Sequence, residues 1–224
     1  MEAALFDWDG TLVDTLPDLY RANVAVMEAF GLPFDEAAYR LHYTPDWRAM
    51  YRDLGVPADR LDEANDRWLA AYESGPPGVL FDGVVDALER LARAGHRLGL
   101  VTAGHRSIVE PQLAAHGLDA LFEAVVYGDD LAVHKPDPAP LHRALGRLGL
   151  ADRPAAAAYV GDVPDDMRMA RAVGAHGVGI VSVLSDERDL LVAGAAEVAR
   201  SVSEWVDRAL GVMRTDRSPR APAV

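Results

Sequence analysis

Ala3-Ala4-Leu5-Phe6-Asp7-Trp8-Asp9-Gly10-Thr11 joins an apolar run to an acidic turn. The apolar run at 3–6 is short and uninterrupted, which predicts a buried strand. Asp9-Gly10 is a turn signal, so the strand should end close to Asp7. The stretch therefore predicts a strand with two carboxylates at its carboxyl end.

Residues 16–78 have a helical pattern instead. Pro17 opens a predicted helix whose apolar residues recur every three or four positions, and Gly31 ends it. Further helices are predicted near 35–42, 45–54 and 59–73, with no convincing strand among them. The chain is then broken by Ser74-Gly75-Pro76-Pro77-Gly78.

Predicted strands and helices alternate after this break. The strands are predicted at 98–101, near 123–127, at 156–160 and at 177–181. The helices are predicted near 83–94, 106–116, from Asp137 onward, and near 165–173, 186–194 and 203–213. This alternation predicts an α/β fold, a doubly wound parallel sheet with helices on both faces. We predict a core from residues 1–15 and 79–213, an inserted helical cap at 16–78, and a disordered tail at 214–224.

Composition limits the partners and the compartment. The net charge is −13, which makes nucleic acid and anionic membranes poor partners and leaves a small molecule as the expected one. The chain has no cysteine, no secretory pattern and no long apolar run, so a cytoplasmic protein is expected. We expect a monomer or a homodimer. Lys135 is the only lysine among 22 basic residues, so that position either needs a compact ammonium or is a chance survival.

Polar side chains follow four of the predicted strands or lie just beyond them. They are Asp7 with Asp9, Thr102, Lys135, and Asp162 with Asp166. Because ligands of doubly wound sheets bind beyond the carboxyl ends of the strands, these side chains should meet in one crevice. The hydroxyl of Thr102 and the N–H groups beyond it, in Ala103-Gly104, could hold phosphate oxygens there. A loop threonine and a surface lysine are the simpler alternatives.

The carboxylates of Asp7 and Asp9 suit phosphoryl transfer. Asp7 could attack phosphorus, and Asp9 could act as general acid and then general base. A plain Asp-Gly turn is the alternative, whereas a calcium loop would need glycine at Leu12 and glutamate at Asp18. Helix capping could explain Asp162 or Asp166 taken singly. Four or five converging carboxylates would repel each other, and oxygen ligands without cysteine predict Mg²⁺ between them.

Taken together, these motifs resemble the haloacid dehalogenase superfamily, in particular its phosphoglycolate-phosphatase-like branch with a helical cap and a Rossmann-like core. The resemblance runs from Leu5 to about residue 210 and rests on four motifs in order. They are Asp7 to Asp14, Val101-Thr102, Lys135-Pro136, and Gly161-Asp162 through Asp166 with Ala170 and Gly174.

The resemblance implies a role for each motif residue. Asp7 would form an aspartyl-phosphate, and Asp9 would protonate the leaving oxygen and then activate water. Mg²⁺ would be held by Asp7, the main-chain oxygen of Asp9, and Asp162. Asp166 would orient metal-bound water or Lys135, and Thr102 and Lys135 would neutralise the phosphoryl group.

The cap and the loop after the second motif depart from the family pattern. Tyr43-Thr44-Pro45 stands where many caps have Gly-Xaa-Pro, and Ala103 replaces a commonly polar residue. The loop from Tyr43 to Arg48 has an aromatic pair beside an arginine, and arginine suits a carboxylate or a second phosphate. Tyr43 and Arg48 are therefore candidate substrate-binding residues. Packing of Trp47 in the cap core with a solvated Arg48 is the alternative.

Rival functions differ in the residues they need. Asp9 argues against a dehalogenase, and a cap without lysine argues against a phosphonatase. We expect a phosphatase for a small phosphomonoester, of the phosphoglycolate or sugar-phosphate type. A sugar phosphomutase, a pyrophosphatase and a non-catalytic binding module remain the alternatives.

Overall fold

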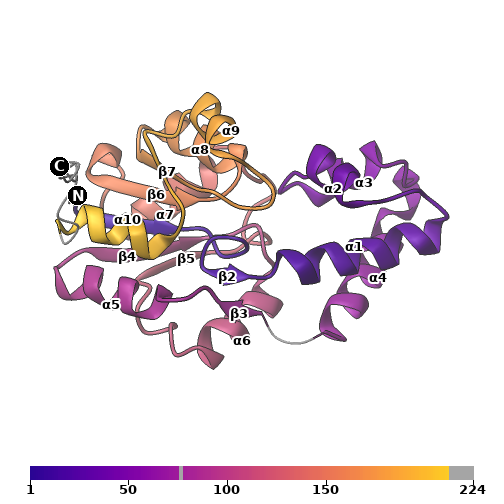
Figure 1. Cartoon of the computed structure of the whole chain (residues 1–224), viewed down its shortest axis with the longest axis horizontal. Coiled ribbons are helices and arrows are strands. Elements are labelled where there is room, and N and C mark those ends of the chain that lie inside the picture. Colours follow the sequence, from indigo (N-terminus) through magenta and orange to yellow (C-terminus); the bar gives the residue numbers. More distant parts are fainter. Residues whose placement is uncertain (76–77, 212–224) are drawn as a thin grey trace, which may run out of the picture.

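A computed structural model describes residues 1–75 and 78–211 of the chain. Within these residues, six strands form one parallel sheet in the order β5-β4-β1-β6-β7-β8 (Figure 1). Their bounds are β1 Ala3–Phe6, β4 Arg97–Val101, β5 Ala124–Val126, β6 Ala157–Gly161, β7 His176–Ile180 and β8 Glu197–Ala199. The doubly wound α/β fold predicted from the alternating pattern is therefore confirmed.

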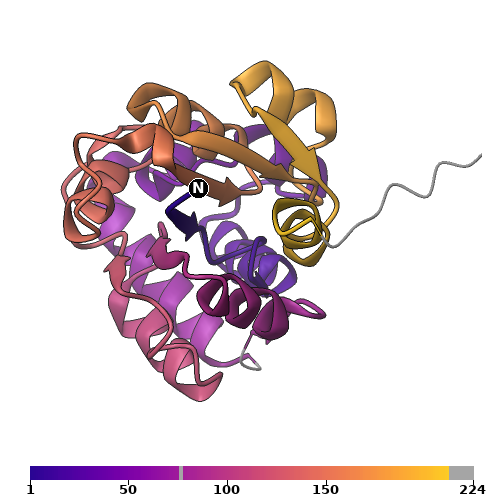
Figure 2. The ribbon, with the colours of Figure 1, turned by 90° about the vertical axis from the view of Figure 1, so that its left-hand side faces the viewer.

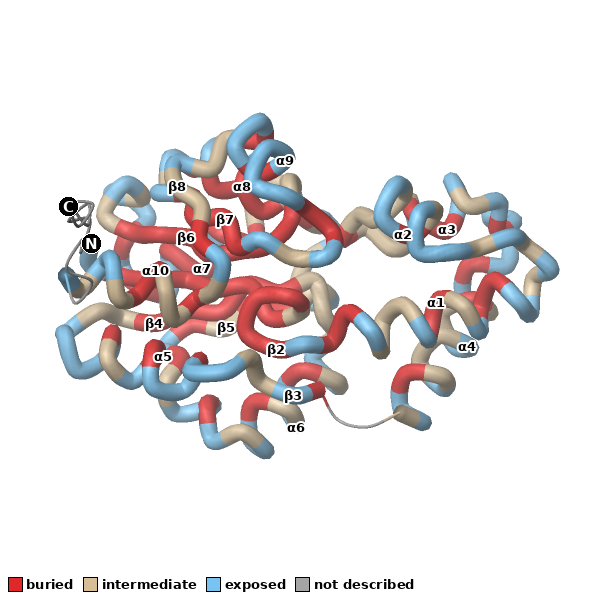
Figure 3. The backbone as a smooth tube through the Cα atoms, viewed as in Figure 1, coloured by how far each residue is buried: buried red, intermediate tan, exposed pale blue. Residues whose placement is uncertain are grey.

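Helices cover both faces of this sheet (Figure 2). They are α5 Val84–Arg93, α6 Arg106–Ala115, α7 Ala139–Arg147, α8 Pro164–Val173, α9 Glu187–Ala193 and α10 Val202–Ala209. Phe6 packs with α5, α6 and α10 on one face, and Leu5 packs with α7 and α8 on the other. Because successive side chains of β1 enter different cores, the whole strand is apolar and buried. The strands β4 and β6 beside it are likewise mostly buried (Figure 3).

Four helices form a separate group beside the sheet. They are α1 Leu16–Phe30, α2 Glu36–His42, α3 Trp47–Asp53 and α4 Leu61–Glu73, with a short 3-10 turn at Ala58–Arg60 before α4. They share one apolar cluster that includes Met27 and Tyr51, and Val163 and Leu184 from the sheet side also join it. In Figure 1 this group lies to the right of the sheet. No strand occurs within 16–75, as the helical pattern predicts.

Three short strands were not anticipated. β2 Val13–Asp14 and β3 Val79–Leu80 pair antiparallel where the chain leaves the sheet and returns to it, and β8 forms an edge of the main sheet. Runs of two or three residues are too short to have a recognisable period.

Some expectations lie outside the described residues. The Pro76-Pro77 part of the predicted break and the predicted tail at 214–224 belong to this group. In the described part of the chain, no helix combines the length and the apolar character needed to cross a bilayer.

Candidate active site

Three adjacent strands deliver the site's carboxylates and its hydroxyl. Asp7 follows β1, Thr102 follows β4 and Asp162 follows β6, and β1 lies between the other two in the sheet. Lys135 precedes α7, and Asp166 lies in the first turn of α8. All five side chains are buried although all are polar. The structure thus brings Asp7, Lys135, Asp162 and Asp166 together at the carboxyl edge of the sheet, with Thr102 at the end of the neighbouring strand.

Lys135 is held between two carboxylates. Its Nζ lies 2.7 Å from Asp7 Oδ1 and 2.9 Å from Asp166 Oδ1, and its side chain is only 3% exposed. Burial alone would lower the pKa of Lys135, but Asp166 and Asp7 outweigh that effect and raise it, so the ammonium stays charged. Burial raises the pKa of Asp7 to about 7, although Lys135 acts in the opposite direction. The only lysine of the chain is therefore a buried group of the site.

The carboxylates of Asp7, Asp162 and Asp166 gather around one point. Each offers an oxygen, and these oxygens lie within 4.8 Å of one another. Burial, followed by the charges of Asp7 and Asp166, raises the pKa of Asp162 well above its usual range. Lys135 supplies a single positive charge against three formal negative charges. A cluster with this excess is unfavourable unless a cation joins it.

Two oxygen atoms at this cluster are available as ligands. Asp162 Oδ2 is buried and has no hydrogen-bond partner among the described residues, while its Oδ1 accepts a 3.3 Å hydrogen bond from Thr11. The main-chain oxygen of Asp9 likewise accepts no hydrogen bond within the described part of the chain. An orphaned buried oxygen is costly, and a divalent cation would satisfy it. The residues present therefore fit Mg²⁺, which prefers such oxygen ligands.

Glycine is required at two positions that touch the carboxylate cluster, Gly10 and Gly161. Gly10 has φ +75°, and a Cβ built on it would lie 2.6 Å from Asp162 Oδ2. A Cβ on Gly161 would overlap the carboxylate of Asp166. These two positions allow the backbone to approach the carboxylate cluster closely, which a side chain would prevent.

Gly10→Ala should lower both stability and the affinity for Mg²⁺. The left-handed backbone alone costs an alanine about 1–2 kcal/mol of unfolding free energy, and the new methyl group would also displace Asp162. Gly31→Ala is the matched control, because Gly31 has φ +67° and no atom lies within 4 Å of its built Cβ. Denaturant unfolding should show a lower free energy of unfolding for both variants. A Mg²⁺ titration should show a lower affinity for Mg²⁺ only in Gly10→Ala. Equal Mg²⁺ affinities would contradict this account of Gly10.

Asp9 lies apart from the Lys135 ion pair. The Thr15 hydroxyl donates a 2.6 Å hydrogen bond to Asp9 Oδ1 and fixes the carboxylate. Burial raises the pKa of Asp9, and the Thr15 hydrogen bond only partly offsets this. A carboxyl group with a raised pKa gives up its proton less readily than an ordinary carboxyl group, which suits a general acid that must later act as a base.

The loop after β4 faces the same carboxylate. Gly104 N–H donates a 2.9 Å hydrogen bond to Thr102 Oγ1, so the loop folds back on its own hydroxyl. A Cβ on Gly104 would lie 3.4 Å from Asp9 Oδ2, which places this glycine beside Asp9. The structure therefore brings Thr102, Ala103 and Gly104 to the edge of the site, as the sequence predicts.

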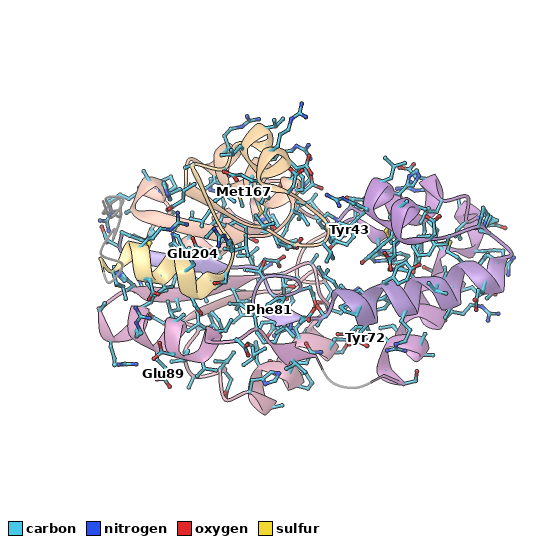
Figure 4. The ribbon with its side chains drawn as sticks, in the orientation of Figure 1. Tyr43, Tyr72, Phe81, Glu89, Met167 and Glu204 are labelled. Atoms are coloured by element: carbon cyan, nitrogen blue, oxygen red, sulfur yellow. The ribbon has the colours of Figure 1, made fainter. Side chains whose placement is uncertain are left out.

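A cavity of about 110 Å³ extends from Asp9 into the helical group. Among its lining residues are Tyr43, Ala103 and Gly104, three of the predicted substrate-binding residues. Figure 4 shows Tyr43 where the helical group meets the sheet. Arg48 does not line the cavity. Its guanidinium lies over the Trp47 ring and 3.8 Å from Asp62 Oδ1, and its side chain is about half exposed.

Two residues that touch the site were not anticipated. Tyr159 Oη lies 3.1 Å from Asp166 Oδ1 and 3.0 Å from the Val101 carbonyl oxygen, and its ring lies below Lys135. Thr15 holds Asp9. In the sequence, a tyrosine inside an apolar strand is indistinguishable from an ordinary core residue. Only the hydrogen-bond partners of its hydroxyl show that Tyr159 contacts the site. Thr15 follows the quoted motif closely, and its spacing of six from Asp9 is the signal that could have identified it.

Known proteins resemble the chain over most of its length. The family model described as haloacid dehalogenase-like hydrolase matches residues 4–180. A phosphoglycolate phosphatase from Colwellia psychrerythraea is 32% identical over 80% of this chain and 84% of its own length. A probable phosphatase, IndB, from Dickeya dadantii is 30% identical over 96% of both chains.

The fold resemblance extends to solved structures. A hydrolase from Pseudomonas syringae superposes with a TM-score of 0.82 and 24% identity, covering 96% of this chain and all of the other. The sheet order, the motif residues at its carboxyl edge and the family match agree with one another. The chain therefore belongs to the haloacid dehalogenase-like hydrolase family, and it is an enzyme of the phosphatase type within it.

Proposed function

We propose that this enzyme is a Mg²⁺-dependent phosphatase that hydrolyses a small phosphomonoester of the phosphoglycolate or sugar-phosphate type. The reaction proceeds through an aspartyl-phosphate on Asp7. The observation that carries this proposal is the position of Asp7, which pairs with buried Lys135 at 2.7 Å inside a cluster of carboxylates. The similarity to phosphoglycolate phosphatases over about four fifths of the chain supports the substrate class.

In the first step, a carboxylate oxygen of Asp7 attacks phosphorus. The bond between phosphorus and the leaving-group oxygen breaks, and Asp9 donates its proton to that oxygen, so an alcohol leaves. Lys135 and the main-chain N–H of Ala103, the residue after Thr102, hold the negative oxygens of the phosphoryl group during transfer. Thr15 keeps Asp9 oriented toward the leaving oxygen.

In the second step, Asp9 acts as a base. It takes a proton from a water molecule whose oxygen attacks the phosphorus of the aspartyl-phosphate. The bond from phosphorus to Asp7 breaks, inorganic phosphate leaves, and the Asp7 carboxylate and the protonated Asp9 are restored. Each proton that Asp9 donates in the first step is thus recovered in the second.

Mg²⁺ would be held by Asp7, Asp162 and the main-chain oxygen of Asp9, with Asp166 beside them. When bound, the cation offsets the negative charge that the phosphate group brings to this cluster. Tyr159 and the main-chain N–H of Val163 hold the Asp166 carboxylate at hydrogen-bond distances of 3.1 and 3.3 Å. Asp166 can therefore keep Lys135 in place beside Asp7.

Residues 16–78 would form the cap of this enzyme, inserted into a core of residues 1–15 and 79–213. The shared apolar cluster of α1 to α4 and the short β2–β3 pair at the two crossings support this division. In this arrangement the cap would shield the intermediate from bulk water. We also propose that the enzyme acts in the cytoplasm, since the chain has no cysteine.

Hydrolysis of p-nitrophenyl phosphate tests the proposed function. We expect turnover in the presence of Mg²⁺, loss of turnover with excess EDTA, and recovery when Mg²⁺ is restored. Asp152→Asn, an exposed site in a turn, should behave as wild type. Turnover that continues in EDTA would contradict the proposed requirement for Mg²⁺. Absence of turnover with every phosphomonoester tested would contradict the proposed phosphatase activity.

Lys135→Arg should reduce kcat although it conserves the charge. The ammonium lies between Asp7 and Asp166 with the Tyr159 ring 5.5 Å away, and a wider planar guanidinium cannot occupy the same space. A displacement of about 1 Å can cost roughly 10²-fold, and we expect a loss of at least about tenfold.

Arg188→Lys is the control for this exchange, because Arg188 is exposed on α9. The measurement is kcat with saturating Mg²⁺, together with the thermal midpoint to confirm folding. A Lys135→Arg enzyme within twofold of wild type would remove Lys135 from the reaction.

A further inference from the structure

We propose that the leaving group of the natural substrate is uncharged, a small alcohol such as a polyol or sugar rather than a hydroxy acid or a second phosphate ester. This inference rests on the proposed phosphatase function and narrows its substrate class to the sugar-phosphate type, because phosphoglycolate would release glycolate, a hydroxy acid. It follows from the cavity that begins at Asp9. Because Asp9 protonates the leaving oxygen, the group attached to that oxygen must lie in the space beyond Asp9, which is this cavity.

Aromatic rings form much of the cavity wall. Tyr43, Trp47, Trp68 and Tyr72 all line it, and Ile108 adds an apolar side chain from α6. Trp68 and Tyr72 are stacked with ring centroids 5.0 Å apart, so they present a continuous surface. Such walls bind the C–H surfaces of an uncharged ligand and offer no compensation to a desolvated anion.

Cationic side chains are missing from this wall. Among the described residues that line the cavity there is no arginine and no lysine, and His105 is the one side chain able to carry a positive charge. Arg48 is turned onto Trp47 and toward Asp62. A carboxylate or second phosphate would therefore enter without the arginine fork that usually receives such groups.

The charges near the cavity also oppose a second anion. Asp9 stands at its inner end, with the carboxylate cluster beyond. Burial, and then the neighbouring Tyr39 and the aspartates, raise the pKa of Tyr43 well above its usual range, so negative charge is disfavoured at that position. Lys135 does not line the cavity, because it is committed to Asp7 and Asp166.

Neutral polar groups are present instead. Asn23 and Asn65 line the cavity. Asn23 is occupied by Tyr51 Oη and the Leu19 carbonyl, but the Asn65 side chain has no partner within the described part of the chain. An amide between aromatic rings suits the hydroxyl groups of a polyol or sugar.

A matched pair of substrates tests the inference. Glycerol 3-phosphate and 3-phosphoglycerate differ only in a hydroxymethyl group against a carboxylate. We expect wild-type kcat/KM to favour glycerol 3-phosphate by at least about tenfold, since unpaired charge in such a site is strongly rejected. Equal values, or a preference for 3-phosphoglycerate, would overturn the inference while leaving the phosphatase proposal intact.

A variant that adds the missing cation should weaken the preference. Asn65→Lys places an ammonium in the cavity wall and should reduce the ratio of the two kcat/KM values by about tenfold or more. Asp66→Asn is the control, because it changes the net charge equally at the next, exposed position of α4 and should leave the ratio unchanged. An identical shift in both variants would overturn the inference, because net charge rather than the cavity would explain the preference.

Hydrolysis of p-nitrophenyl phosphate distinguishes a failure of the uncharged leaving group from a failure of the proposed phosphatase function. If it is hydrolysed, a substrate ratio of the wrong sign counts against the uncharged leaving group alone. If neither it nor either member of the pair is hydrolysed, the proposed function fails and this inference fails with it.

Discussion

Asp7→Asn should abolish hydrolysis of phosphomonoesters, with less than about one hundredth of wild-type kcat remaining, because removal of a covalent nucleophile leaves only residual binding and electrostatic effects. An amide cannot form the acyl-phosphate, and it is a poorer ligand for Mg²⁺ than a carboxylate. The variant also loses the 2.7 Å ion pair with Lys135. Three effects thus act in the same direction at one residue.

The fold of this variant should remain intact. Lys135 keeps its contact with Asp166 at 2.9 Å, and the change removes one of three crowded negative charges. The lost attraction to Lys135 lowers the stability of the fold, whereas the lost repulsion from Asp162 and Asp166 raises it, so the two effects oppose each other. The measurement is kcat in saturating Mg²⁺ with the thermal midpoint as the folding control. Activity above about one hundredth of wild type in a folded variant would exclude Asp7 as the nucleophile.

Asp9→Asn should slow the reaction by about 10²- to 10⁴-fold with an alkyl phosphate, the usual contribution of general acid–base catalysis. An asparagine can still receive the Thr15 hydrogen bond, so the local geometry is retained while the proton is lost. The effect on kcat/KM should be smaller with p-nitrophenyl phosphate, whose leaving group needs little protonation. The second step still needs a base, so the phosphorylated enzyme should accumulate with that substrate.

The comparison of substrates makes this prediction specific. An equal fold-loss of kcat/KM for alkyl and p-nitrophenyl phosphates would show that Asp9 does not protonate the leaving oxygen. Thr15→Val is a useful companion, because it leaves the carboxylate in place but removes its 2.6 Å hydrogen bond. That variant should show a smaller loss, with the same dependence on the leaving group.

The sequence predicts the sheet and the convergence of its polar ends for a physical reason. An uninterrupted apolar run such as 3–6 has few alternatives to a buried strand, and parallel strands place their carboxyl ends at one edge. The order β4-β1-β6 then brings Thr102, Asp7 and Asp162 together. The structure places these residues as expected, while their catalytic roles stay predictions.

The cap side of the site could not be predicted in the same way. Trp47 and Arg48 are neighbours on α3, and successive helical residues point about 100° apart, so both cannot face one cavity. Which of them does so depends on how α3 packs against α1 and α4, and the short run 45–54 does not contain that information. In the structure Trp47 lines the cavity, and the guanidinium of Arg48 lies over the Trp47 ring. The two-residue strands β2 and β3 escape prediction because their pairing is set by the ends of the helical insertion.

Covalent trapping on Asp7 tests the central claim most directly. The enzyme is mixed with a phosphomonoester and Mg²⁺, quenched in acid within the first turnover, and treated with borohydride, which reduces an acyl-phosphate to homoserine. Peptide mass spectrometry should find homoserine at position 7 and none in Asp7→Asn, and with p-nitrophenyl phosphate as the substrate it should find more homoserine in Asp9→Asn. Steady turnover without any modification at position 7, or modification of a different residue, would contradict the account.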